Sequence, residues 1–69
     1  MDAQTLADAV AKILYAEDNC SRALGMEIIE VKPGFARLRM KIRDDMVNGH
    51  KTAHGGMIFT LADSTFAFA

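Results

Sequence analysis

The first part of the chain repeats apolar residues with the period of an α-helix. Four of them fall on one face, at positions i, i+4, i+7 and i+8: Leu6, Val10, Ile13 and Leu14. This stripe predicts an amphipathic helix that stops near residues 17–19. This helix could begin at either of two places: after a cap formed by Thr5 together with Asp8, or after a cap formed by Asp2.

The middle of the chain predicts a β-hairpin. Residues 20–24 form a short helical turn closed by a glycine, and residues 26–32 follow as a strand rich in Ile and Val. The alternation of this strand is imperfect, because two isoleucines are adjacent. Residues 35–43 predict a second strand with one buried face, because apolar and basic side chains alternate strictly from residue 36 to residue 43. Pro33 and Gly34 suit the centre of a type II turn between the strands.

The last part of the chain predicts a helix that is apolar on most of its circumference. After a loop over residues 44–53, we expect this helix to run from about Met57 to the end of the chain. A helix with this pattern is buried on most sides. Two strands cannot cover it, so more sheet must come from residues outside these 69 or from a partner chain. The pattern therefore indicates one α+β domain or one piece of such a domain, and truncation after the central helix is one of the two explanations.

The chain is also short for a protein that folds alone. It is 51% hydrophobic and has one cysteine, so composition argues against disorder and a single thiol excludes an internal disulfide. Eight Lys/Arg against nine Asp/Glu give a net charge of −1, which makes no case for a nucleic acid or a membrane as partner. We find no targeting segment and no stretch long enough to span a bilayer, and we expect a cytoplasmic setting.

Asp63 is the most distinctive polar residue of the last helix. A lone carboxylate on an otherwise apolar helix is costly to bury unless it is paired or faces a cavity. One interpretation is a general base or nucleophile with a raised pKa. The other is an aspartate on the helix face, bonded to Thr60, to an arginine or to solvent.

His54, Gly55 and Gly56 immediately precede that helix. Backbone N–H groups at a helix start can approach a ligand, and the helix dipole favours negative charge there, which is how an oxyanion site is built. The simpler alternative is a turn that needs positive φ.

Other polar clusters have more ordinary interpretations. His50 and His54 are four positions apart, but no third or fourth ligand accompanies them, so we expect no metal site. A basic stripe lies on the polar face of the second strand: Arg37, Arg39, Lys41 and Arg43. It either meets the phosphates of a ligand or forms a solvated sheet face, which is the commoner arrangement. Cys20 is interpreted as structural.

The spacing of the two sharpest features constrains any shared site. Asp63 lies eight positions after Gly55, which is about 12 Å along a helix. A base and an oxyanion donor that act on one carbonyl must each lie about 3 Å from their targets. One helix cannot easily supply both groups, whereas two antiparallel copies around a two-fold axis would bring the glycines of one beside the aspartate of the other.

The stretch NGHKTAHGGMIFTLAD, residues 48–63, resembles the signature of hotdog-fold acyl-CoA thioesterases, in particular the phenylacetic-acid-degradation (PaaI-type) group. The resemblance extends over essentially the whole chain. It implies a hotdog fold, in which a long buried helix is wrapped by a curved antiparallel sheet. Members of the family are roughly twice as long, a normal single-domain size. Residues 1–69 would then be the N-terminal part of one hotdog thioesterase domain, without the later strands, the acyl pocket and the CoA contacts.

The resemblance also implies roles for individual residues. Asp63 would activate water or attack the thioester, and the Gly55 N–H would polarise the thioester carbonyl. Asn48 would hold the water or the carboxylate, and His54 would contact the thioester end of the substrate. Asp63 would come from the chain opposite the one that supplies Asn48 and Gly55.

The remaining implications concern binding and assembly. Gly56, which shapes the turn, and Ser64 would belong to the substrate-binding site. Homodimers that share active sites, and homotetramers, are the expected assemblies. No cofactor or metal is implied, since CoA is part of the substrate.

Hydrolysis of an acyl-CoA, aryl-acetyl-CoA or hydroxyphenylacetyl-CoA in particular, to the free acid and CoA is therefore the function that we expect. One alternative is a non-catalytic hotdog protein that binds acyl-CoA or only assembles. Another is a hotdog hydratase or dehydratase, which would need a catalytic histidine that His54 does not clearly supply. We expect the 69-residue chain on its own to be inactive, because its apolar helix is left uncovered.

Overall fold

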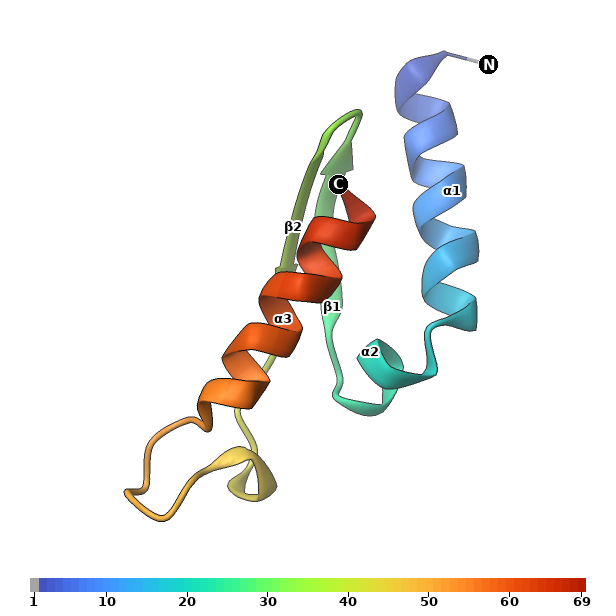
Figure 1. Cartoon of the computed structure of the whole chain (residues 1–69). Helices are drawn as coiled ribbons and strands as arrows, with labels where there is room; N and C mark the ends of the chain where they lie inside the picture. The colour runs from blue at the N-terminus through green and yellow to red at the C-terminus, as the bar shows by residue number, and fades with distance from the viewer. Residues whose placement is uncertain (1) are drawn as a thin grey trace.

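Helices at both ends of the chain flank a two-stranded hairpin in the computed structural model, which describes residues 2–69 (Figure 1). The elements in chain order are α1 (Ala3–Glu17), α2 (Asn19–Ala23), β1 (Glu27–Lys32), β2 (Phe35–Arg39), the 3₁₀ turn η1 (Asp44–Met46) and α3 (Gly55–Phe68). The strands pair antiparallel. The connection from β2 to α3 extends beyond the hairpin at the end opposite its turn (Figure 1).

Aspartate caps define the two N-terminal helices. The Asp2 side chain accepts a hydrogen bond from the Thr5 N–H (2.7 Å), so Asp2 is the cap of α1 and the alternative start at Thr5 is wrong. Asp18 ends α1 and caps α2, where its side chain accepts from the Ser21 N–H (2.9 Å). Gly25 closes α2 with a φ of 71°, as the sequence predicts.

The hairpin explains the imperfect alternation of its first strand. The register shifts between Ile28 and Glu30, which leaves Ile29 as an extra residue in a β-bulge. Two adjacent isoleucines can therefore occupy one strand, since the bulge resets which side chain faces α1. At the turn, Gly34 has a φ of 71°, which confirms the predicted need for glycine there.

The second strand ends at Arg39 instead of at Arg43, where the sequence pattern placed its end. The reason lies in the partner strand. Arg39 pairs with Glu27, the first residue of β1, so later residues of the second strand have no partner backbone. The chain then makes η1, a 3₁₀ turn that the sequence pattern did not predict.

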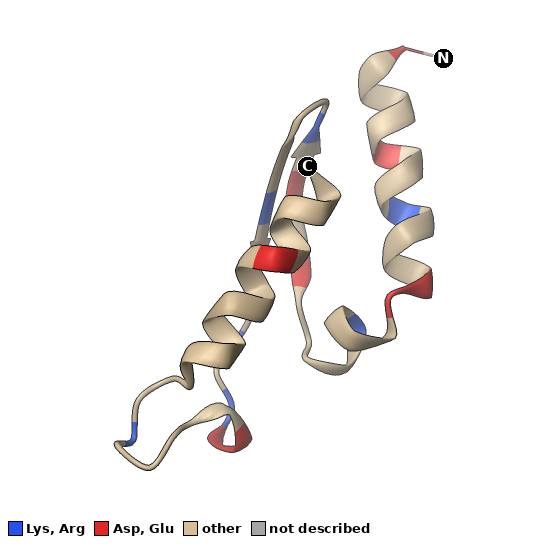
Figure 2. Ribbon diagram, in the orientation of Figure 1, with Lys and Arg blue, Asp and Glu red and all other residues tan. Residues whose placement is uncertain are grey.

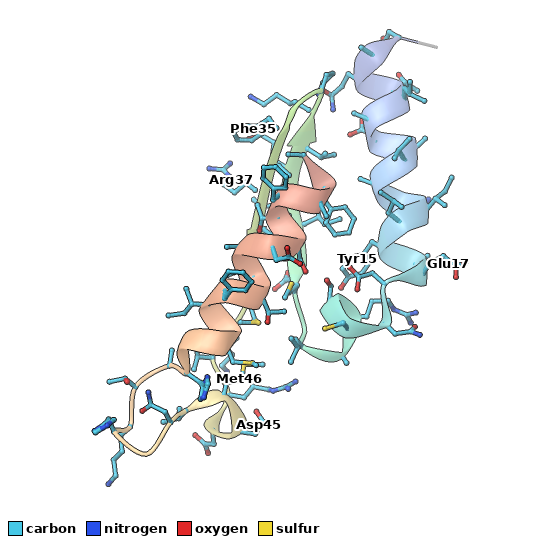
Figure 3. The ribbon with its side chains drawn as sticks, viewed as in Figure 1. Tyr15, Glu17, Phe35, Arg37, Asp45 and Met46 are labelled. Atoms are coloured by element: carbon cyan, nitrogen blue, oxygen red, sulfur yellow. The ribbon has the colours of Figure 1, made fainter. Side chains whose placement is uncertain are left out.

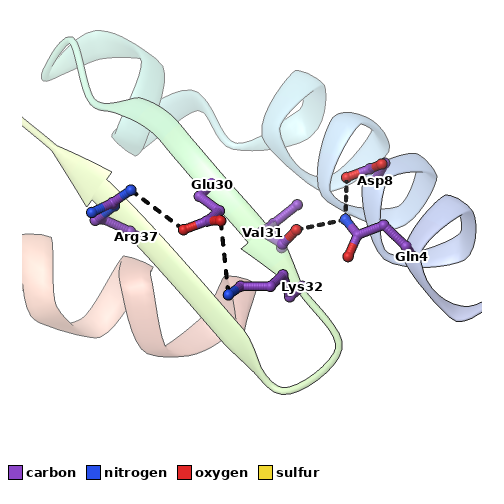
Figure 4. Close-up of polar contacts among 6 residues, drawn as sticks. All are labelled: Gln4, Asp8, Glu30, Val31, Lys32 and Arg37. Carbon is purple, nitrogen blue, oxygen red and sulfur yellow. Dashed lines mark hydrogen bonds and ion pairs between the residues drawn. The ribbon is translucent and has the colours of Figure 1, made fainter.

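Ion pairs across the hairpin neutralise much of the basic stripe. Arg39 pairs with Glu27 (3.1 Å). Arg37 pairs with Glu30 (3.3 Å), and Lys32 also approaches Glu30 (3.8 Å) (Figure 4). The side chains in these pairs are largely exposed, so each pair contributes about 0–1 kcal/mol. This arrangement favours a solvated sheet face over a phosphate site.

α1 packs against β1, and one polar contact fixes its N-terminal end. The Gln4 amide donates to the Val31 carbonyl (2.7 Å) and to the Asp8 carboxylate (2.9 Å) (Figure 4). Figure 4 shows Gln4 reaching from α1 to the edge of β1. This side of β1 is consequently occupied by α1.

α3 begins at Gly55, two residues before the predicted start, and most of its apolar surface is uncovered in this chain. Phe59 is 74% exposed and Phe66 is 84% exposed, although the pattern predicts a buried helix. The described core contains only four buried hydrophobic side chains: Ala11, Met26, Met46 and Phe68. The radius of gyration is 13.4 Å, against about 11 Å for a compact chain of this length. Two strands leave α3 largely exposed, as the sequence argument required.

The hairpin turn supplies a test of the fold. Gly34→Ala should lower the free energy of unfolding by about 1 kcal/mol, because a Cβ at a φ of 71° strains the backbone although the space around it is open. Gly49→Ala is the matched control, since Gly49 also has open space and its φ is not positive. Chemical denaturation of the two variants measures the difference, and equal losses would contradict the assigned turn.

Candidate functional site

Asn48 organises the loop that precedes α3. Its side-chain oxygen accepts hydrogen bonds from the His50 N–H (2.8 Å), the Thr52 N–H (3.3 Å) and the Thr52 hydroxyl (3.2 Å). These donors require the carbonyl end of the amide to face the loop. The NH₂ end therefore points the other way and has no acceptor among residues 2–69. Two N–H donors of Asn48 remain available to a ligand.

The same loop is anchored at the base of α3. Val47 and Ala53 form an isolated antiparallel bridge, and the His54 N–H donates to the Met46 carbonyl (2.7 Å). Met46 is only 2% exposed, and Figure 3 shows it beside the first turn of α3. Lys51 has a φ of 62° in this turn, which the sequence did not predict for a residue with a side chain. The loop thus brings Asn48 and His54 to one end of α3.

The first turn of α3 leaves one backbone donor free. The Gly56 N–H donates to Nδ1 of His54 (2.9 Å), and the Met57 N–H donates to the His54 carbonyl (2.9 Å). The Gly55 N–H has no acceptor within residues 2–69. Because Nδ1 accepts a hydrogen bond, it carries no proton, and the proton of a neutral His54 imidazole lies on Nε2.

The two glycines have different local requirements. Neither has a positive φ, so the alternative that they only permit a left-handed turn is wrong. A Cβ on Gly56 would lie 3.1 Å from Nδ1 of His54, closer than an ordinary van der Waals contact, so a side chain at this position would displace the imidazole cap by a few tenths of an ångström. A Cβ on Gly55 would meet nothing within 4 Å. The space beside the Gly55 N–H is open in this chain.

Asp63 is exposed on α3, in the middle of the helix. Two structural explanations for it fail: the Thr60 hydroxyl donates to the Gly56 carbonyl (2.7 Å), and each ion pair of an arginine among residues 2–69 involves another acid. Figure 2 shows one acidic band on α3 and no basic residue. The Asp63 carboxylate therefore has no protein partner in the described chain.

Ser64 contacts α2, and within residues 2–69 its side chain makes no hydrogen bond to the loop before α3. Its Oγ lies 2.9 Å from Oγ of Ser21, which donates in turn to the Asp18 carboxylate (2.6 Å). Sequence reasoning did not find Ser21 and Asp18, although an aspartate three positions before a serine is a recognisable capping pattern. The structure thus places Ser64 in an internal hydrogen-bond chain.

An open apolar groove of about 580 Å³ separates α3 from β2. Its lining includes Phe35, Leu38, Ile58, Leu61 and Phe66. None of the site residues named above from the sequence lines this groove. The groove and the loop end of α3 are therefore distinct regions of the chain.

Two further features bear on the type of site. Within residues 2–69, no three His, Cys, Asp or Glu side chains are grouped closely enough to hold a metal ion. In the same residues, no helix has both the length and the apolar character required to cross a bilayer.

The chain is similar to known proteins in sequence and in fold. No family model matches the chain. The chain is 46% identical over 59 residues to the acyl-coenzyme A thioesterase PaaI of Escherichia coli strain K12, a match that covers 86% of this chain and 42% of that protein. Its fold matches the E. coli PaaI protein from the phenylacetic acid degradation operon with a TM-score of 0.95 and 41% identity, over 99% of this chain and 49% of that chain. The chain spans slightly less than half the length of these relatives.

The Asp18 contacts predict how the fold responds to acid. Hydrogen bonds from the hydroxyl and the backbone N–H of Ser21 hold the pKa of Asp18 below its usual value of 3.8. A lowered pKa stabilises the fold above the unfolded value, and that contribution is lost as the pH falls below 3.8 through the folded pKa. Asp18→Asn should thus be less stable than the wild type by about 1 kcal/mol at pH 7.

Urea denaturation of both proteins between neutral pH and about pH 2.5 measures this difference. We expect the gap in unfolding free energy to narrow in acid, because asparagine does not titrate. A gap that is constant with pH would contradict the lowered pKa of Asp18.

Proposed function

We propose that this chain, which matches slightly less than half of the acyl-coenzyme A thioesterase PaaI in sequence and about half of the E. coli PaaI protein in fold, is the N-terminal part of a hotdog domain and supplies the reacting groups of an enzyme that hydrolyses acyl-CoA thioesters. Water adds to the thioester carbonyl, the C–S bond breaks, and the free acid and the CoA thiol leave. The observation that carries the proposal is the free N–H of Gly55 at the start of α3, beside open space.

Gly55 is the proposed oxyanion donor. When the nucleophile adds, negative charge develops on the thioester oxygen, and a backbone N–H at a helix N-terminus stabilises it without reorganising. His54 contributes indirectly, because its Nδ1 and its carbonyl occupy the N–H groups of Gly56 and Met57. The Gly55 N–H is then the donor at this helix start that a substrate oxygen can use.

Asp63 is the proposed general base or nucleophile. Its carboxylate is exposed and has no partner in residues 2–69, so it is available to a water or a thioester. The NH₂ group of Asn48 would orient the water or the carboxylate, and Nε2–H of His54 would contact the thioester end of the substrate. Each of these donors is freed by a local hydrogen bond at the other end of its side chain.

Two copies of the chain would form each site. Within one α3, the rise from Gly55 to Asp63 is about 12 Å, too far for both to act on one carbonyl. A two-fold axis would place Gly55 and Asn48 of one chain beside Asp63 of its partner. Homodimers, or tetramers built from them, and a cytoplasmic location are parts of this proposal.

The substrate class rests on the relatives' printed descriptions. PaaI of E. coli is described as an acyl-coenzyme A thioesterase, and its solved structure as that of a protein from the phenylacetic acid degradation operon, so we propose an aryl-acetyl or hydroxyphenylacetyl-CoA. The reaction would require no cofactor or metal. His54 argues against a hydratase, since its Nδ1 is engaged by the Gly56 N–H and the other nitrogen of the neutral ring carries the proton. A non-catalytic acyl-CoA-binding protein is the alternative that the assay must exclude.

The role of Asp63 can be tested by kinetics. Asp63→Asn keeps the shape of the side chain and removes its basicity, so kcat should fall by about 10²–10⁴-fold. Thiol release from a panel of acyl-CoAs measures this loss, in protein expressed from its complete reading frame. The 69-residue chain is assayed in parallel and should show no turnover.

Asp8→Asn, in an exposed aspartate of α1, is the matched control and should keep the wild-type rate. Unchanged turnover in Asp63→Asn would defeat the proposed mechanism. Acyl-CoA binding without turnover in the wild type would favour the binding protein instead.

The Gly55 donor can be removed without disturbing the helix start. Proline is well tolerated at the first helical position and lacks an N–H, so Gly55→Pro should fold and lose about 10²–10³-fold in kcat. Gly55→Ala retains the donor and has space for its Cβ, so it should lose much less. Equal losses in the two variants would contradict the oxyanion role.

Mixing Gly55→Pro with Asp63→Ala tests whether the site is shared. A mixed dimer would contain one intact site, so re-equilibrated equal mixtures should recover about a quarter of wild-type activity. Absence of recovery, in mixtures shown by mass spectrometry to contain heterodimers, would reject the shared site.

A further inference from the structure

Ser64 makes the one side-chain hydrogen bond that joins α3 to another element within residues 2–69. Its Oγ lies 2.9 Å from Oγ of Ser21 in α2, whereas the other side-chain hydrogen bonds of α3, from Thr60 and Thr65, stay within the helix. In the described part of the chain, no side-chain hydrogen bond joins α3 to the hairpin or to α1. The hydrogen bond between Ser64 and Ser21 is therefore the directional contact that joins α3 to α2, and we refer to it as the tether.

The direction of each proton in this tether follows from its chemistry. Ser21 has one hydroxyl proton and donates it to the Asp18 carboxylate (2.6 Å), so the Ser64 hydroxyl must donate to Oγ of Ser21. The other oxygen of Asp18 accepts the Ser21 N–H (2.9 Å). Asp18 thus holds both the backbone and the side chain of Ser21.

Ser21 is a rigid acceptor because it is completely enclosed. Its exposed fraction is 0%, and its carbonyl accepts from the N–H of Met26, which is also 0% exposed. The cost of burying the Ser21 hydroxyl is offset only while its hydrogen bonds are intact. The tether consequently has one favoured geometry.

A second contact lies one helical turn further along the same face of α3. Phe68 is 8% exposed and packs on Tyr15 with ring centroids 6.3 Å apart, while the Tyr15 hydroxyl donates to the Met26 carbonyl (2.6 Å). Figure 3 shows Tyr15 near the end of α1 that adjoins α2. An apolar contact of this kind resists separation but permits sliding and rotation. The serine pair adds the directional constraint.

We propose that the Asp18–Ser21–Ser64 chain is a positioning device, which sets the rotation of α3 and thereby the direction of the Asp63 carboxylate. The inference rests on the function proposed above for Asp63. Asp63 precedes Ser64 by one residue, so any rotation of α3 about its axis moves the carboxylate sideways. Displacements of about 1 Å in a reacting group can cost up to about 100-fold in rate.

A double-mutant cycle in the protein expressed from its complete reading frame tests this role. Ser21→Ala and Ser64→Ala should each lower kcat by about 10-fold and change KM by less than about twofold. The double variant should be no slower than either single variant, because the two serines act as a unit. Ser64→Thr, which restores a hydroxyl, should recover most of the lost kcat.

Thr65→Val is the matched control. It removes a hydroxyl from the adjacent position of α3, but that hydroxyl bonds only to the Leu61 carbonyl of the same helix, so kcat should be unchanged. All rates are measured well below the melting temperature of each variant. Wild-type kcat in folded Ser21→Ala would overturn the proposal. A raised KM in Ser64→Ala with a silent Ser21→Ala would overturn it in favour of direct substrate contact.

Residual dipolar couplings of backbone amides give a readout that needs no activity. In Ser64→Ala the orientation of α3 relative to α1 should shift, and Ser64→Thr should restore it. An unchanged orientation overturns the positioning role. A wild-type protein without thioesterase activity would instead reject the function proposed for Asp63, while the couplings still decide whether the serine pair orients α3.

Discussion

His54 determines where α3 begins and which backbone donor stays free. Its N–H donates to the Met46 carbonyl, its carbonyl accepts from Met57, and its imidazole accepts from Gly56. These three bonds join a buried methionine of the connection to the first turn of the helix. Without the imidazole cap, the Gly56 N–H would also be free and the first turn would lose a stabilising contact. The geometry of the oxyanion donor proposed here depends on this cap.

The helices and strands, and most of the residues that end them, could be predicted from the sequence, because they depend on local interactions. The apolar stripe of α1, the glycines that close α2 and form the hairpin turn, and the pairing of β1 with β2 each depend on residues close in sequence. The end of β2 could not be predicted in this way, since it depends on where the partner strand begins, at Glu27. Site residues 48 and 54–56 lie at one end of α3, as their order in the sequence implied. The contact of Ser64 with Ser21 joins residues 43 positions apart, and no local sequence pattern could predict it.

The exposed surface of α3 reflects a limit on what two strands can cover. β2 meets one side of the helix and α1 with α2 meet another, which leaves Phe59 and Phe66 mostly in solvent. The chain exposes 5016 Å² in total, against about 4200 Å² for a compact monomer of its mass. Exposed aromatic side chains on this scale favour further coverage of α3, and the chain spans less than half of the relatives it matches.

A common principle links the groups to which we assign chemistry. Each reacting group is free of internal hydrogen bonds, because the polar atoms nearest to it are bonded to other partners. The oxygen of Asn48 is held by its own loop, which frees the amide NH₂. The Thr60 hydroxyl is bonded to the Gly56 carbonyl, which leaves Asp63 without a local donor. A substrate that approaches the start of α3 therefore meets donors that the fold leaves free, and one that approaches the middle of α3 meets a free acceptor. Little internal hydrogen bonding must be broken to engage either.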